Sequence, residues 1–481
     1  MNNKDSGLRS GLKWNSIAQL LNQASVFLTG FILMRLLTPE DFGLVAIVTV
    51  FLGFSQLFTT VGLSSSIINK KDITKHDFDN IFTFSFFMGL VMALILFLLS
   101  TRLALFFEDT RLEVLFKISA LALFIAPLGA IPSAVLKRRL KFKALALINI
   151  FSTFIALFVA IIMAYYDYGY FSLIAQKVIY YGLNVILLFF ASKYAPSFWF
   201  NFLNLKKHLA FGVPILGSNL VNYSIGNIDN FLIGKFLGAN SLGYYGRAFA
   251  LVTIPSTRIG MIINQTMFPV FSNMKNKNID IKENVLKLYS IISYTVFLFA
   301  LLYIVAARSL IQIISPDGEW DSIIPIIHAL ALVSIFKPII GFYSSTIISL
   351  GLTKLSFKAE LVGGVIIVIG FIIGINFDIL YFSYIYGFTS LLYFVYYTII
   401  FSKVLNFKKF TLFHVLKHKL LSFILIGVII YFYLKLNFSS PIIELPISLI
   451  IVGLIWLLIN FMLDKKTSYF LINAMKSIVK K

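Results

Sequence analysis

The stretch IFTFSFFMGLVMALILFLLS, residues 81–100, runs for twenty residues without a charged side chain. A helix needs about 20 apolar residues to cross the hydrocarbon core of a bilayer. Only helices and closed barrels satisfy their backbone groups in lipid, and this run is too long and continuous for a barrel strand. The stretch therefore predicts a transmembrane helix and makes the chain an integral membrane protein.

Similar runs recur along the whole chain. Hydrophobic residues make up 59% of its 481 residues and charged residues only 13%, whereas roughly a quarter of a soluble chain is charged. The connections are short, so no soluble domain is large enough to hold an active site of its own. We predict an all-α membrane protein with about fourteen spans, near residues 14–36, 42–66, 81–100, 113–135, 145–165, 171–192, 209–233, 243–268, 287–312, 323–350, 358–376, 380–402, 416–435 and 442–463.

The loop charges predict the topology. With the N-terminus inside, the inward segments carry about 30 of the 41 Lys and Arg residues and the outward ones about 6. Excess Lys and Arg mark cytoplasmic loops, so an even number of spans with both termini in the cytoplasm is expected. This explains the net charge of +21 without a nucleic-acid partner.

The absence of cysteine excludes disulfides and thiolate sites, and no histidine pair has the spacing of a metal site.

The sequence resembles itself at an offset near 200. FILMRLLTPEDFG (31–43) aligns with FLIGKFLGANSLG (231–243), which puts Gly43 on Gly243, and RLKFKA (139–144) aligns with KLSFKA (354–359). The repeat joins span one to span seven, so its unit is six helices. Because six is even, both copies enter the membrane in the same direction, as in transporters whose substrate site lies between two parallel repeats. The predicted division is two six-helix lobes and an extra helix pair, at 1–200, 201–405 and 406–481.

Polar residues recur inside two equivalent spans. They share one helical face in each span and should avoid lipid. We expect them to line a central cavity, although helix–helix hydrogen bonds worth about 0.6–2 kcal/mol each are the alternative. The predicted cavity-lining residues are Gln19 and Asn22 in span one and Asn219 and Asn222 in span seven.

Charged residues inside the predicted spans are mostly cations. An ionisable group at mid-bilayer costs from about 2.5 to more than 10 kcal/mol and by default marks function. For Lys117 and Arg247, near span ends, snorkelling is the alternative. A cationic interior fits an anion with a large polar body, because Arg and Lys hold phosphate oxygens well. The candidate substrate-binding residues are Arg258, Lys177, Lys337, Arg247 and Lys117.

Taken together, these features resemble the oligosaccharide flippases, Wzx-type exporters of the multidrug/oligosaccharidyl-lipid/polysaccharide superfamily. The resemblance rests on the span count, the two six-helix halves and the motif of a basic residue, Arg35, followed by LLTPEDFG (36–43). IPSAVLKRRLKFKALA (131–146) resembles in particular the colanic- and teichuronic-acid exporters.

This resemblance implies a MATE-like fold of two lobes and a function. Members move undecaprenyl-pyrophosphate-linked oligosaccharide units across the bacterial inner membrane by alternating access, and polysaccharide polymerase and chain-length regulator proteins are expected partners. No cofactor is expected beyond coupling to an H⁺ or Na⁺ gradient. Asp229 is the acid nearest the expected lumen and the candidate coupling residue.

Two other classes of function remain open at this point. One is a lipid II flippase or multidrug exporter of the same superfamily, although a cationic interior disfavours cationic drugs. The other is an enzyme, a membrane polysaccharide polymerase or glycosyltransferase. Such an enzyme needs catalytic acids, and the outward acids, Glu40–Asp41, Glu108–Asp109 and Asp317–Glu319–Asp321, lie in short connections where they fit turns and caps.

Overall fold

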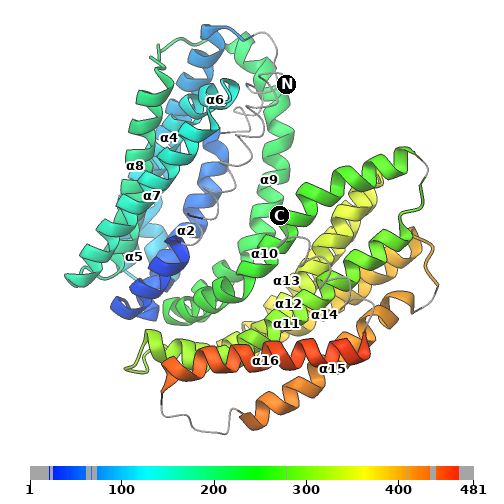
Figure 1. Ribbon diagram of the computed structural model, residues 1–481. Helices are drawn as coiled ribbons and strands as arrows, with labels where there is room; N and C mark the ends of the chain where they lie inside the picture. The colour runs from blue at the N-terminus through cyan, green and yellow to red at the C-terminus, as the bar shows by residue number, and fades with distance from the viewer. Residues whose placement is uncertain are drawn as a thin grey trace. The chain divides into compact units, whose positions relative to one another are not determined.

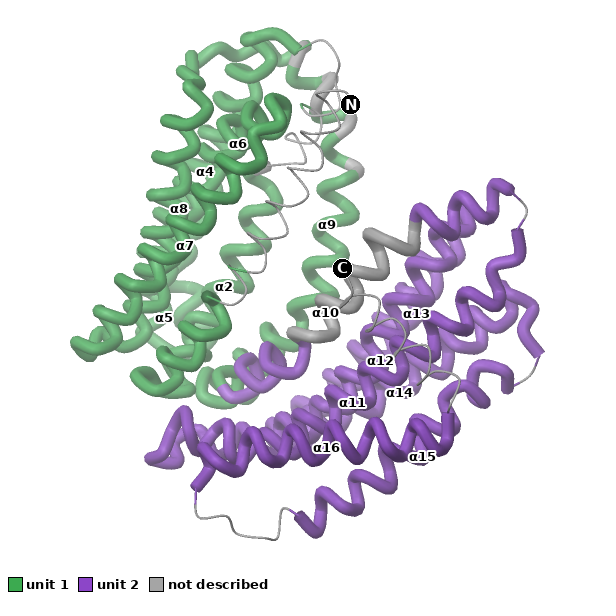
Figure 2. The backbone as a smooth tube through the Cα atoms, in the orientation of Figure 1, with its two compact units in different colours: residues 1–243 green, residues 244–481 purple. Residues whose placement is uncertain are grey.

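A computed structural model of the chain describes a set of long helices (Figure 1). It covers residue 21 and residues 25–60, 67, 73–277, 279–408, 410–433 and 440–464. Within these ranges, nothing is described of the side chains of residues 60, 204, 207, 208, 211, 214 and 254–268. The chain divides into two compact units, residues 1–243 and 244–481, which Figure 2 distinguishes by colour.

The first unit contains the helices that precede Gly243. Its longest members are α4, which pairs closely with α5, and α9, which packs against α2 and α4. The helices are Ser25–Leu36, α2 (Pro39–Thr60), α4 (Lys75–Phe107), α5 (Arg111–Ile125), the 3-10 turn η1 (Ala126–Gly129), α6 (Ala130–Arg138), α7 (Phe142–Tyr165), α8 (Tyr170–Ser192) and α9 (Phe202–Phe236). The next helix, α10 (Gly238–Asn276), begins in this unit and continues into the second.

The second unit is built around α12, which packs against α11, α13 and α14. The pair α15 and α16 packs on α11. Its helices are α11 (Lys282–Ile314), α12 (Ile323–Ser349), α13 (Thr353–Gly374), α14 (Ile379–Val404), α15 (Thr411–Tyr433) and α16 (Pro441–Leu463).

The predicted spans agree closely with these helices. Spans two to fourteen, apart from span four, each fall on one helix. Span four falls on α5, η1 and α6, and the 3-10 turn η1 contains Pro127. Among the described residues, eleven helices are long and apolar enough to cross a membrane. They do not include α9 and α10, which the sequence marks as less apolar than the rest. Residues 25–36 of span one form the helix Ser25–Leu36, whereas residues 14–20 and 22–24 lie outside the described residues.

The outward faces of many helices are apolar. Leu98 on α4, Phe190 on α8 and Met462 on α16 each expose more than 70% of their surface. Large apolar surface of this kind is unfavourable in water but is the normal face of a helix in lipid. Their exposure supports an integral membrane protein.

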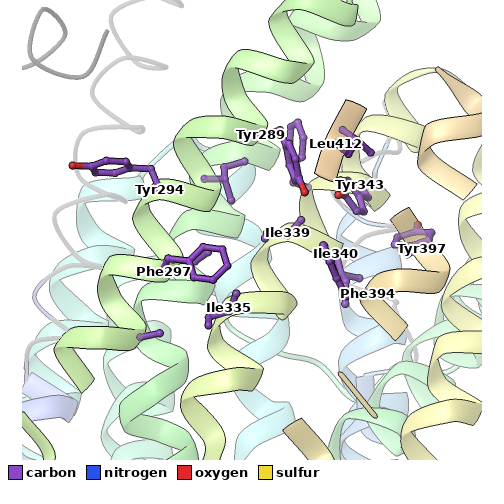
Figure 3. Packing of buried hydrophobic residues seen from close by; sticks show 14 of the residues in the cluster. Tyr289, Tyr294, Phe297, Ile335, Ile339, Ile340, Tyr343, Phe394, Tyr397 and Leu412 are labelled. Atoms are coloured by element: carbon purple, nitrogen blue, oxygen red, sulfur yellow. The ribbon is translucent and has the colours of Figure 1, made fainter. Parts of the chain in front are cut away.

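The core of the second unit is aromatic and tightly packed. Figure 3 shows Tyr289 of α11, Tyr343 of α12 and Phe394 of α14 within one cluster of buried side chains. The ring of Tyr343 stacks on Phe401 with centroids 4.2 Å apart. Lipid tails are as apolar as these side chains, so close packing rather than water exclusion holds such helices together.

The starts of α2 and α10 cross at two glycines. A Cβ atom added to Gly43 would overlap the carbonyl oxygen of Ala239, and one added to Gly243 would overlap that of Pro39. Residue 239 lies 200 positions after residue 39, and 243 lies 200 after 43. The two contacts are therefore reciprocal in the register of the repeat, although the division into six, six and two helices stays a prediction. Helix backbones approach this closely only where glycine leaves out the side chain.

A buried ion pair ties the last two helices to the rest of the second unit. Lys419 on α15 donates hydrogen bonds to Asp464, just after α16, and to Ser290 Oγ on α11 at 2.7 Å. The side chains of the ion pair are only 2% and 13% exposed. The predicted topology groups Lys419 with the cytoplasmic cations, at the start of the span predicted at 416–435, and its burial gives it a structural role as well.

Replacing Lys419 by alanine should destabilise the protein by about 3–5 kcal/mol, because it leaves a buried carboxylate without its cation. The measurement is thermal unfolding of the purified protein in detergent. A double variant, Lys419→Met with Asp464→Leu, removes both charges and should recover most of the lost stability. A single variant that unfolds at the wild-type temperature would show that the pair contributes nothing.

Candidate functional site

Lys177 of α8 lies on the inside of the first unit against α2. Its ammonium group donates a hydrogen bond to Thr49 Oγ1 at 2.5 Å, and that hydroxyl donates in turn to the carbonyl oxygen of Val45 at 2.6 Å. The side chain of Lys177 is half-buried. Lys177 lies seven residues after the start of α8, about two turns inside the helix.

The contacts of Lys177 and Thr49 continue as a polar strip to a third helix, α9, through Tyr223. Its hydroxyl donates to the carbonyl oxygen of Val50 at 3.0 Å, and its own backbone oxygen accepts from the Asn227 amide at 2.8 Å. Gly53 makes room for the phenol, because a Cβ atom there would overlap the Tyr223 hydroxyl. The lysine, the threonine and the tyrosine thus join α8, α2 and α9.

A cavity of about 230 Å³ opens between α2 and α9 beside this strip. One wall is apolar and comes from α2, with Val50, Phe51 and Phe54. The other comes from α9 and includes apolar side chains beside Tyr223 and Asn227. The lining is therefore mainly apolar with a few polar groups, as is common in ligand pockets.

The second candidate cation of the first unit, Lys117, is locally paired. It forms an ion pair with Glu113 at 2.6 Å, one helical turn earlier on α5. Its ammonium group also lies 5.7 Å from the centroid of the Phe97 ring on α4. This environment favours the local role that the sequence left open for Lys117.

In the second unit, Lys337 of α12 is exposed and stands over an aromatic ring. Its ammonium group lies 4.9 Å from the centroid of Phe249 on α10, and Phe249 stacks against Tyr386 of α14. Cation–π contacts of this kind contribute about 0.5–2 kcal/mol. Arg247, two residues before Phe249, is half-buried.

The remaining predicted residues have different environments. Asn219 and Asn222 are exposed on α9, whereas Asp229 is buried and accepts a hydrogen bond from the Asn230 backbone at 2.8 Å. Gln19, Asn22 and the side chain of Arg258 lie outside the described residues, although position 258 belongs to α10. The roles of these residues stay predictions.

One acidic cluster emerges only from the structure. Glu360 of α13 accepts hydrogen bonds from Ser344 of α12 and from Ser356, which also shares a hydrogen bond with Tyr397 of α14. The sequence shows Ser356 and Glu360 one helical turn apart, but nothing in it indicates the partners on α12 and α14. A carboxylate with two hydroxyl donors, one of them linked to a third hydroxyl, can hold or pass on a proton.

The outward acids act as caps and ion-pair partners. Asp41 accepts from the Thr38 backbone and side chain and from the Tyr170 backbone, each at 3.0 Å. The hydrogen bond from Lys235 lowers the pKa of Glu108, and that from Arg111 lowers the pKa of Asp109. These partners explain the carboxylates without catalysis.

Comparisons with known proteins agree with this architecture. The chain is 27% identical over 369 residues to the teichuronic acid biosynthesis protein TuaB of Bacillus subtilis (strain 168), covering 76% of this chain and 75% of that one. It is 22% identical over 351 residues to the lipopolysaccharide biosynthesis protein WzxC of Escherichia coli (strain K12), covering 73% and 71%.

Two solved structures share the fold. One is the lipid II flippase MurJ in an inward closed conformation, with a TM-score of 0.66 at 15% identity over 92% of this chain and 98% of that one. The other is a multidrug resistance MATE family transporter of the MOP superfamily in an inward-facing conformation, with a TM-score of 0.60 at 14% identity over 80% and 95%. The MATE-like fold predicted from the sequence is thereby confirmed.

The family assignment rests on a match over more than half of the chain. The profile described as "polysaccharide biosynthesis protein" matches residues 32–325, from the end of the first apolar helix to the start of α12. The chain belongs to this family of polysaccharide biosynthesis proteins.

Proposed function

We propose that the chain is a flippase that exports undecaprenyl-pyrophosphate-linked oligosaccharide repeat units for the assembly of a surface polysaccharide, such as O-antigen, capsule or exopolysaccharide. The family match, the named relatives in polysaccharide biosynthesis and the flippase fold support this assignment. The protein would work in the bacterial inner membrane, with both termini in the cytoplasm, by alternating access of two lobes.

The observation that carries the proposal is Lys177. A lysine well inside a span is costly in lipid and is retained where it serves a substrate or an ion. Here its ammonium group is hydrogen-bonded to the hydroxyl of Thr49. An ammonium group at this position supplies a positive charge that can attract an incoming phosphate. The nearby cavity, mainly apolar with a few polar groups, suits the lipid part of a lipid-linked sugar.

The other candidate cations would act along the same route. Lys337, Arg247 and Arg258 supply the positive charges of the second unit, and Asp229 is the candidate for coupling to an H⁺ or Na⁺ gradient. A polymerase and a chain-length regulator would take over the exported unit. An exporter of cationic drugs is disfavoured by these charges, and a polymerase or glycosyltransferase is disfavoured by the transporter fold.

Deletion of the gene tests the function directly. In a flippase mutant, lipid-linked repeat units should accumulate complete but unpolymerised on the cytoplasmic side of the membrane. They should then be protected in right-side-out cells from an added enzyme that labels exposed sugars. Accumulation of units on the outer side would instead indicate a polymerase, and incomplete units would indicate a glycosyltransferase.

A further inference from the structure

Three helix ends of the first unit converge around a second, larger cavity. α4 begins at Lys75, α6 ends at Arg138 and α8 ends at Ser192. The cavity between them has a volume of about 540 Å³ and is lined by residues of all three ends. The loop charges predict that this end of the unit faces the cytoplasm.

Four cations line this cavity, and we call them the basic rim: Lys75, Arg138, Arg139 and Lys193. The two arginines are fixed in place, because Arg138 donates to the carbonyl oxygen of Ile67 at 2.7 Å and Arg139 to that of Ser192 at 2.8 Å. The two arginines are therefore anchored at the cavity, while Lys75 and Lys193 are exposed beside them.

Helix dipoles explain only part of the basic rim. Arg138, Arg139 and Lys193 stand at helix C-termini, where a cation is favourable. Lys75, however, is the first residue of α4, at the positive end of that helix. A cation placed there beside three others is unfavourable, and the charge of Asp79 on the same helix offsets part of that repulsion.

The acids near the cavity are already engaged. Asp79 is 1% exposed and accepts hydrogen bonds from the Tyr194 hydroxyl at 2.6 Å and from the Ser197 side chain and backbone. Burial and this bond raise the pKa of Tyr194, so the phenol stays neutral. Asp77 is buried and completes the capping box of α4 with Thr74. Among the residues that the structure describes around this cavity, the four cations outnumber these two carboxylates.

The cavity also has the surroundings of a membrane interface. Phe78, Val135 and Tyr194 give it an apolar wall. The segment that follows exposes Phe198 and Phe200, each more than half exposed, as in the aromatic belts of membrane proteins. Asn80 holds this segment to α4 by exchanging hydrogen bonds with the Asn201 backbone at 2.9 and 3.0 Å.

We propose that the basic rim binds the phosphate group of a membrane lipid, with the lipid chain along the apolar wall. Basic pockets between transmembrane helices on the cytoplasmic side are suited to lipid head groups. Two sources share this chemistry: an anionic phospholipid, and the pyrophosphate of the lipid-linked oligosaccharide before it enters the transport route. Only the second source rests on the proposed function.

Native mass spectrometry of the purified full-length protein tests the site. Wild-type protein is titrated with phosphatidylglycerol, cardiolipin, undecaprenyl pyrophosphate and the neutral phosphatidylcholine. The test variant is Lys75→Gln with Lys193→Gln, which spares both anchored arginines. The control is Lys137→Gln with Lys141→Gln, an equal loss of charge at the same end of the unit from two exposed residues outside the cavity lining.

The test variant should bind its preferred anionic lipid about thirtyfold more weakly, since each lysine contributes roughly fivefold, and the control should bind it like the wild type. Preference for undecaprenyl pyrophosphate would identify the lipid-linked oligosaccharide as the source of the phosphate. Preference for phosphatidylglycerol or cardiolipin would identify a membrane phospholipid as the source. Equal loss in the test and control variants, or no preference over phosphatidylcholine, would overturn the site while leaving the flippase assignment untouched. If the double variant does not fold, the single variants Lys75→Gln and Lys137→Gln make the same comparison, with a fivefold difference expected.

Discussion

Valine in place of Gly43 will prevent the protein from folding into a transport-competent form. The new side chain would overlap the backbone of Ala239 at the crossing of α2 and α10, and a backbone atom cannot turn aside as a flexible side chain can. Overpacking typically costs about 1–3 kcal/mol even among side chains, so a larger loss is expected here. The measurement is the yield of monodisperse protein and its unfolding temperature in detergent.

The matching contact of Gly243 with Pro39 and the open surroundings of Gly246 supply the controls for this prediction. Gly243→Val should have an effect of similar size, because its side chain would meet Pro39 in the same way. Gly246 lies three residues further along α10, where an added Cβ atom has no neighbour within 4 Å. The Gly246→Val variant should therefore have a yield and an unfolding temperature close to those of the wild type. If all three variants behave alike, helix propensity rather than the close crossing determines the outcome.

The sequence predicts the helices of this protein well because lipid imposes a simple requirement. Long apolar runs must be helices, and their ends are marked by turn residues and cations. The run at 81–100 lies at the centre of α4, whereas the 3-10 turn η1 interrupts the single span predicted at 113–135. The glycine at 43 could be aligned with that at 243, but the sequence alone gives no sign that each meets the other's helix.

Partners across helices are harder to predict. Helical periodicity shows which residues share a face, but not which face of another helix meets them. Lys177 is visible in the sequence as a cation inside a span, whereas its contact with Thr49, 128 positions earlier, depends on how α8 packs on α2. Lys419 reads as one of several cytoplasmic loop cations until its buried pairing with Asp464 is seen.

Polar clusters built from ordinary serines and tyrosines are the least predictable part. Glu360 is a lone acid in the sequence, and its partners Ser344 and Tyr397 come from two other helices. The basic rim has the same character. Its cations lie in three separate loops, where the positive-inside rule already accounts for them, so the sequence gives no reason to group them around one cavity.

Replacing Lys177 by methionine should abolish polymer export while leaving the protein folded. Methionine is unbranched and flexible like lysine and only one atom shorter, but it carries no charge. A hydrogen bond to a charged group is worth about 1.5–3 kcal/mol, so the loss of one such contact to a substrate phosphate corresponds to a tenfold to hundredfold weaker interaction. The measurement is surface polymer produced by the deletion strain carrying the variant, at equal membrane content of the protein.

Two further variants separate the charge from its surroundings. Thr49→Val removes the hydroxyl that Lys177 contacts but keeps the cation, and should reduce export less than loss of the lysine. Lys117→Met removes another lysine of the same unit, one already paired with Glu113, and should leave export near wild type, because the exposed pair contributes little. Wild-type polymer levels from the Lys177→Met strain would rule out this lysine as a substrate contact. Equal losses of polymer in the Lys177→Met and Lys117→Met strains would indicate that removal of any charge from a span disturbs the protein. A selective loss at Lys177 would mark the interior of the first unit as part of the route taken by the phosphate.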